Sequence, residues 1–387
     1  MSEGRYLDER AAALPQLNAE GRTVRVRDEA MKIFGVPPDY NSYGGNPGLT
    51  QALFTWGQIS AAIKAAAYDK VSAEEQSREA RQLALTEAST SFYTLLLALE
   101  LEEAARDNVA QKRRHLDESE RRFQMEVATD YDVLAGRVAL TNVEPALIQA
   151  VNDIRLAKDR LRYYMRFEEN YDASGSRNCR STPPEPLDRI LERARANRPE
   201  VAYYESRVGV FKELVTVAQA GNKPRLDFKG NAGWSRDDSF NQDYPGYRFD
   251  AGIYLSFPIF DGFLTKGKVM QAKSRLATTE IEMKQLLDRI ALDARNALNR
   301  VDEAVQIVKG LEAVTTQAER LLEMAGTGYQ HGLKTRLEVD DAESNLLTAR
   351  TNLARARPEY LIARTRLLWI MGEDLLLALS NPTFGSP

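Results

Sequence analysis

One short stretch of this sequence changes its periodicity abruptly, and the change occurs twice. Residues 257–273, FPIFDGFLTKGKVMQAK, begin as an apolar strand end and within three residues take on the spacing of a helix. Residues 51–67, QALFTWGQISAAIKAAA, make the same change. When the sequence is shifted by 206 residues against itself, Phe54 falls on Phe260 and the register holds as far as Met165. Such a long period indicates two copies of one large unit.

This tandem duplication predicts two structural repeats, residues 1–186 and 187–387. In the first repeat we expect strands within about 17–54 and a helical hairpin at about 57–168. In the second we expect a helix at about 187–221, strands within about 226–260, a helical hairpin at about 262–371 and a C-terminal tail.

The longest predicted helices carry a coiled-coil pattern. Between residues 283 and 329, apolar positions are spaced alternately by four and three, and Thr315 is the only polar residue among them. A 3.5-residue repeat of this length indicates coiled-coil packing. A helix from about 262 to 329 would be about 100 Å long, which predicts an elongated bundle or tube.

Each long helix is expected to end in a turn and to return as a second helix, from about 130 to 168 and from about 335 to 371. Gly332, in GYQHGLKTR, suits the left-handed conformation that ends a helix. Glu126 stands at the equivalent position of the first copy, so we expect that turn to differ in shape. Pro145 and Pro358 fall inside the return helices and should kink them.

Period-two segments separate the helical stretches. In RFDAGIYLSFPIF, one face would carry apolar side chains from Phe249 to Phe257, and the other face is more polar. This pattern suits a strand of a membrane β-barrel with a wet lumen, although a half-buried soluble hairpin shares it. Two strands in each copy give four strands in each chain, too few to close a barrel. An open sheet edge is not tolerated in lipid, so membrane strands would require several chains.

Composition argues against several other functions. The net charge of -4 does not suit nucleic-acid binding. No apolar run approaches the roughly 18–20 residues of a membrane-spanning helix. The lone Cys179 excludes an internal disulfide, and neither His115 nor His331 has a second ligand at metal spacing. We expect His115, in KRRHLDESERR, to lie on a solvated helix face. Enzyme motifs are missing, so we expect no enzyme activity, no cofactor and no metal.

The order of hairpin, long helix, turn and return helix resembles the TolC family of outer-membrane efflux proteins. The residues that carry the likeness are ALPQL with KPRL, LTQALFTWG with LSFPIFDGF, and RRFQMEVATDYDVLAGR with GYQHGLKTRLEVDDAES, together with RPEV at 198–201. The resemblance implies an α+β membrane protein of long coiled-coil hairpins. Three chains would form a helical α-barrel and share a twelve-stranded outer-membrane β-barrel. It also implies a passive homotrimeric duct with a periplasmic extension, docked to a periplasmic adaptor and an inner-membrane pump or ABC exporter.

The same resemblance implies roles for residues near the helix turns. These are periplasmic gate links at Asp132, Tyr329 and Lys334, an acidic constriction ring of Glu338 and Asp341, and adaptor contacts at Glu126 and Gly332. Three copies of a carboxylate around an axis would attract cations. Lys334 stands where the family often has arginine, which removes bidentate pairing. Apart from the resemblance, these side chains could simply be solvated residues near a turn.

Compared with the second copy, the first lacks most of its first helix, and RYLDERAAALPQL stands in its place. An apolar export signal is also missing, so we expect the chain to be truncated at its N-terminus, by shortening or by choice of start site. Two alternatives remain at this point. A periplasmic adaptor would have one central hairpin rather than two equivalent units, and a soluble coiled-coil scaffold should carry a basic face for lipid.

Overall fold

The computed structural model describes residues 2–35, 37–166, 185–237 and 246–380. It divides into two compact units, and each draws on both sequence repeats. The first unit comprises residues 1–77 and 200–286, and the second comprises residues 78–199 and 287–387. Cys179, the middle of the β3–β4 connection and the end of the C-terminal tail lie outside the described residues.

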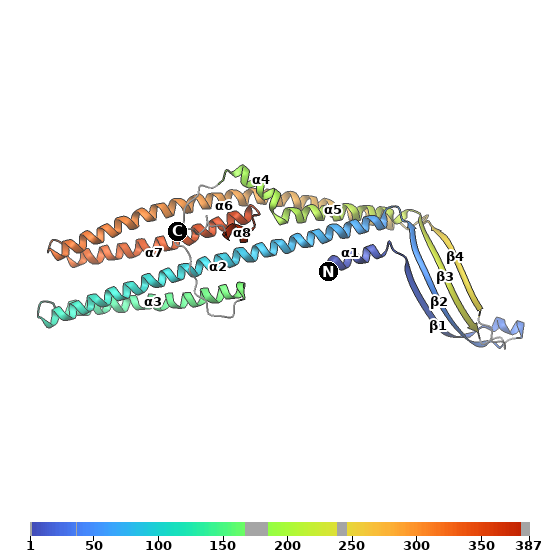
Figure 1. The fold of residues 1–387 in the computed structure, drawn as a ribbon, viewed down its shortest axis with the longest axis horizontal. Helices are drawn as coiled ribbons and strands as arrows, with labels where there is room; N and C mark the ends of the chain where they lie inside the picture. The colour runs from blue at the N-terminus through green and yellow to red at the C-terminus, as the bar shows by residue number, and fades with distance from the viewer. Residues whose placement is uncertain (1, 36, 167–184, 238–245, 381–387) are drawn as a thin grey trace. The chain divides into compact units, whose positions relative to one another are not determined.

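An antiparallel sheet in the order β1-β2-β3-β4 dominates the first unit (Figure 1). Its strands are β1 (Gln16–Arg27), β2 (Asp39–Phe54), β3 (Arg225–Asp237) and β4 (Gly246–Ser256). A 3-10 helix, η1 (Glu29–Phe34), lies between β1 and β2. The pairing of β2 with β3 joins the strands of the two repeats, so the expected four strands form one sheet.

The alternation predicted for β4 is present, with its apolar side exposed. Phe249 is 77% exposed and Ile253 is 65% exposed. Across the sheet, Phe228 pairs with Ile253. On the other face, Asn231 donates a hydrogen bond to Asp250 at 3.0 Å. A soluble hairpin would bury its apolar face and expose its polar face. In this chain the apolar face is exposed, as expected for strands whose outer face meets lipid.

Short helices complete the first unit beside the early turns of α2 (Gln58–Gln124) and α6 (Leu264–Gln330). They are α1 (Ser2–Ala11), α5 (Pro199–Gln219) and the 3-10 helix η2 (Ala220–Asn222). Asp69 of α2 holds two of them, because it accepts from Arg5 of α1 at 3.0 Å and from Arg207 of α5 at 3.3 Å. No helix within the described ranges has the length and apolarity needed to cross a membrane.

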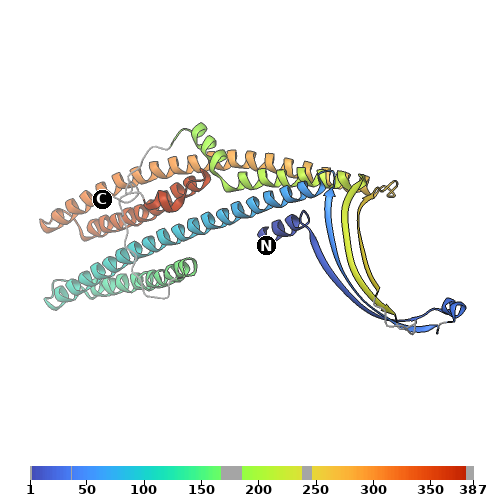
Figure 2. The same ribbon diagram turned by 45° about the vertical axis from the view of Figure 1, so that its right-hand side comes forward.

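Long helices form the second unit, in which the later parts of α2 and α6 run with α3 (Asp130–Met165) and α7 (Arg336–Ile370). In both views these four lie in the order α3, α2, α7, α6 (Figures 1 and 2). Two short helices, α4 (Leu187–Asn197) and α8 (Leu375–Ser380), complete the unit. The single helix expected at about 187–221 is instead divided into α4 and α5, because Arg198 is extended, as is usual for a residue before proline. The α2–α3 hairpin packs through a small cluster that includes Leu95 and Leu161. The largest cluster joins α4, α6 and α7 around the fully buried Ile190 and Tyr360.

The duplication is visible in the backbone. α2 and α6 each have 67 residues, and their bounds differ by the 206 residues of the sequence register. Left-handed residues recur at the same offset, as Trp56 with Gly262 and Arg166 with Gly372. The predicted long helices, turns and return helices are therefore confirmed. Both return helices continue through their internal prolines.

The two helix turns have the same shape, so the expectation that Glu126 makes the first one different is wrong. Glu126 has φ 61° and Gly332 has φ 70°. The Glu126 N–H donates to Phe123 at 2.9 Å, as the Gly332 N–H donates to Tyr329 at 3.0 Å. The residues on either side also match: the Val127 N–H donates to the Arg122 carbonyl, as the Leu333 N–H donates to the Gly328 carbonyl. These hydrogen bonds impose the left-handed conformation on glutamate at some cost in strain, because its Cβ crowds the next carbonyl.

This strain predicts opposite effects of two substitutions. Glu126→Gly should raise the free energy of unfolding by roughly 0.5–1 kcal/mol, since relief of left-handed strain exceeds the added chain entropy of glycine. Gly332→Ala should lower it by about 1 kcal/mol. Thermal unfolding followed by circular dichroism measures both. A destabilising Glu126→Gly would show that the side chain of Glu126, rather than its backbone, stabilises the turn.

Candidate functional site at the helix turns

A cavity of about 320 Å³ lies beside the turns in the second unit. It is lined by residues of α2, α3, α6 and α7, among them His115, Arg122, Asp132, Tyr329 and Asp340. Two of the predicted gate residues, Asp132 and Tyr329, therefore face the same space. Its lining mixes acidic and basic side chains.

Asp132 caps the helix on which it lies. Its Oδ2 accepts from the Thr129 N–H and from the Thr129 hydroxyl, both at 2.8 Å, while Thr129 Oγ1 accepts from the Asp132 N–H. This reciprocal capping box satisfies two backbone donors at the start of α3. The bond from the Thr129 N–H, followed by that from its hydroxyl, lowers the pKa of the exposed Asp132 carboxyl.

Glu338 is the equivalent residue in the second copy and forms the equivalent cap with Thr335. Its Oε2 accepts from the Thr335 N–H at 2.8 Å, and its Oε1 accepts from Lys334 Nζ at 2.5 Å. The Lys334 hydrogen bond first, and then the Thr335 N–H, lower the pKa of Glu338 to about 2. Thr-x-x-Asp and Thr-x-x-Glu are sequence signals for such caps, and they predict this local role.

The remaining predicted residues lie around these caps. Tyr329 Oη accepts from Arg122 at 3.1 Å, and Asp341 is exposed one turn beyond Glu338. Within the described part of the chain, no hydrogen bond joins Asp132 to Tyr329 or to Lys334. The structure therefore places the gate residues in one region without linking them inside a single chain.

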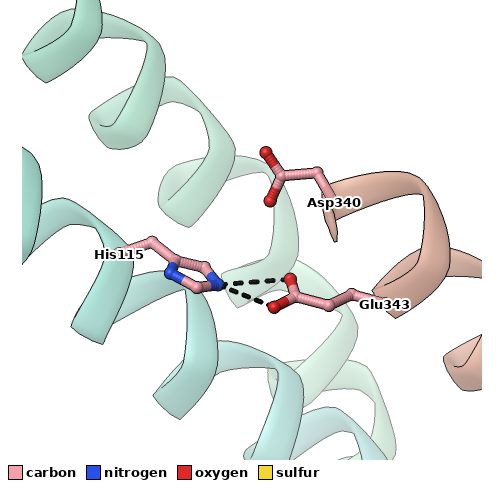
Figure 3. A group of neighbouring side chains, drawn as sticks. All are labelled: His115, Asp340 and Glu343. Carbon is pink, nitrogen blue, oxygen red and sulfur yellow. Dashed lines mark hydrogen bonds and ion pairs between the residues drawn. The ribbon is translucent and has the colours of Figure 1, made fainter. Parts of the chain in front are cut away.

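A half-buried ionic cluster between α2 and α7 was missed at the level of sequence. The expectation that His115 lies on a solvated face is wrong, because its side chain is 22% exposed and its Nε2 lies 3.0 Å from Glu343 Oε1 (Figure 3). Glu343 is 8% exposed and also lies 3.4 Å from Lys112 Nζ. Burial raises the pKa of Glu343, but the hydrogen bond and charge of His115, with Lys112, outweigh it and lower the pKa to about 2.

The fold thus belongs to a class in which long helical hairpins are joined in sequence to strands with an exposed apolar face. The sequence profile of the outer membrane efflux protein family matches residues 5–165 and 190–373. The two matched stretches lie within the two predicted repeats. The chain belongs to the outer membrane efflux protein family, and it serves as an exit duct in the outer membrane.

Individual relatives agree with this assignment. The outer membrane protein TolC of Escherichia coli is 23% identical over 86% of this chain and 70% of its own length. The alkaline protease secretion protein AprF of Pseudomonas aeruginosa is 26% identical over 89% of this chain and 73% of its own length. The CmeC outer membrane channel of Campylobacter jejuni superposes with a TM-score of 0.82 at 16% identity, over 99% of this chain and 84% of CmeC. These are channel proteins rather than enzymes.

The caps predict an acid-sensitive helix start. The pKa of Glu338 is lowered, so its contribution to stability is complete above about pH 4.5 and is lost as the pH falls toward 2. Glu338→Gln should remove this acid dependence at the start of α7. Hydrogen exchange of residues 335–338, corrected for intrinsic rates, measures it, and the Asp132 cap of α3 is the internal control. Equal acid loss in wild type and Glu338→Gln would contradict the assigned cause.

Proposed function

We propose that three copies of this chain form a closed outer-membrane duct, gated at the helix turns. The proposal rests on the exposed strand edges of the first unit and the exposed apolar helix faces of the second. β1 and β4 each have one neighbour in the described sheet, and lipid cannot satisfy an open strand edge. Pairing of β4 with β1 of the next chain would close a ring, and three chains would supply twelve strands.

The second unit supports the same closure. α3 and α6 are its outermost long helices, and each exposes an apolar stripe. The α3 stripe consists of Tyr131, Leu134, Val138, Ile148, Leu156 and Tyr163, and the α6 stripe of Ile307, Val314 and Leu321. The residues within each stripe share a helix face. Contact between α3 of one chain and α6 of the next is a heterologous interface, which generates a ring when its rotation closes.

This closure predicts that a charge within the α3 stripe blocks assembly. Ile148→Glu should convert the trimer into monomers, because a carboxylate would be buried against apolar side chains without a partner. Ala146→Glu is the matched control, since Ala146 is also exposed but lies on nearly the opposite side of α3, two residues or about 200° from Ile148. Light scattering in detergent measures the mass. A trimer that survives Ile148→Glu, or a wild-type monomer or dimer, would rule out this interface.

A gate at the turns is the second part of the proposal. Glu338 uses Oε2 for its cap and Oε1 for Lys334. Asp132 uses only Oδ2, and Ala128 stands at the position equivalent to Lys334. Asp132 Oδ1 is therefore available to a donor from elsewhere. We assign that donor to Tyr329 or Lys334, of the same or a neighbouring chain, as the gate link.

The other turn residues complete the proposal. Glu338 and Asp341 would form the acidic constriction around the axis. The exposed turns at Glu126 and Gly332 would contact a periplasmic adaptor, which links the duct to an inner-membrane pump or ABC exporter. The family name supports efflux, and a relative named for protease secretion supports type I secretion.

The gate link predicts leakage when it is removed. Asp132→Ala combined with Lys334→Ala should raise single-channel conductance in planar bilayers severalfold, with the trimer unchanged. Thr129→Ala is the matched control, because it breaks the α3 cap and keeps the Asp132 carboxylate. Equal conductance of the double variant and wild type would reject the link. Equal leakage in Thr129→Ala would assign the effect to the cap alone.

A further inference from the structure

Three side chains from two hairpins form a group that could ligate a metal. His115 comes from α2, whereas Asp340 and Glu343 come from α7 (Figure 3). One ligand atom from each lies within 4.8 Å of the others. The His115 Nε2 is already 3.0 and 3.2 Å from the two oxygens of Glu343. Asp340 and Glu343 are three residues apart and so project from one face of α7.

These ligand types suit a divalent transition metal. Imidazole nitrogen and carboxylate oxygen both bind Zn²⁺ and Co²⁺ at about 2.0–2.2 Å. In a tetrahedral site the ligand atoms would be about 3.3 Å apart, so a modest side-chain movement would be enough. Water could occupy the fourth position.

A lysine already supplies positive charge to the same oxygens. Lys112 Nζ lies 3.5 Å from Asp340 Oδ1 and 3.4 Å from Glu343 Oε2. Arg336 lies 3.5 Å from both oxygens of Asp340, and it also approaches Glu118 at 3.8 Å. The Lys112 ammonium shows that the carboxylates of Asp340 and Glu343 already bind a cation. A metal ion would have to displace its ammonium group.

The group is also accessible. Lys112, His115 and Asp340 line the 320 Å³ cavity beside the turns. Glu343 lines a second cavity of about 410 Å³ on the same unit. The three ligands therefore lie between two open spaces, through which a hydrated ion could enter and lose its water.

We propose that His115, Asp340 and Glu343 bind one divalent transition-metal ion per chain, in exchange with the Lys112 ammonium. Such an ion would join α2 to α7, and with them the two helical hairpins of the chain. This site uses neither the gate residues nor the trimer interface, so it stands independently of the proposed function.

Cobalt titration of the metal-free protein in detergent tests the site. We expect visible d–d absorption bands that saturate at one Co²⁺ per chain and disappear when Zn²⁺ is added. His115→Gln should abolish the bands. His331→Gln, at the exposed second histidine, should leave them intact. Circular dichroism and light scattering confirm that each variant has the fold and the mass of the wild type.

Lys112→Met provides a gain of affinity that misfolding cannot imitate. Removal of the competing ammonium should tighten Co²⁺ binding on the order of tenfold. The proposal is overturned if wild type and Lys112→Met show only the spectrum of hydrated Co²⁺. It is also overturned if the bands persist in His115→Gln or vanish in His331→Gln. In either case the group would be an ion-pair latch between the hairpins.

Discussion

Unsatisfied backbone at the two edges of the sheet is the constraint on which the rest of this protein depends. Water can pair with the free N–H and C=O groups of an edge strand, but lipid cannot. β1 and β4 are such edges, in a sheet whose apolar side chains are exposed. The exposed stripes of α3 and α6 pose the same problem among the helices. Both are resolved if each chain is one segment of a closed ring.

The tandem duplication builds such a ring segment from two copies of one unit. Each copy contributes two strands to one sheet and one hairpin to one helical layer, and the β2–β3 pairing joins the copies. Because the copies share a register, their turns, caps and left-handed residues match in detail. Small sequence differences between them then acquire specific meanings. Lys334 occupies one oxygen of Glu338, whereas Ala128 leaves the corresponding oxygen of Asp132 available.

Periodicity predicted the long helices to within a few residues, since a heptad pattern and a constant offset constrain the same elements twice. It could not predict the cluster at His115, because no periodic signal states which face of α2 meets α7, and the partners lie 225 and 228 residues away. The caps of Asp132 and Glu338 were readable from Thr-x-x-Asp and Thr-x-x-Glu. The turn at Glu126 was misjudged because residue preference was weighed above the hydrogen bonds that close the turn.

The equal lengths of α2 and α6 limit how this chain can vary. One residue added to either helix would move its turn by about 1.5 Å and rotate it by about 100°. The caps at Thr129 and Thr335 would then no longer lie level with each other, although every local interaction remained intact. Exposed faces can absorb many substitutions, whereas an insertion or deletion in one long helix requires a matching change in the other. The matched lengths of α2 and α6 therefore keep the two turns at the same level.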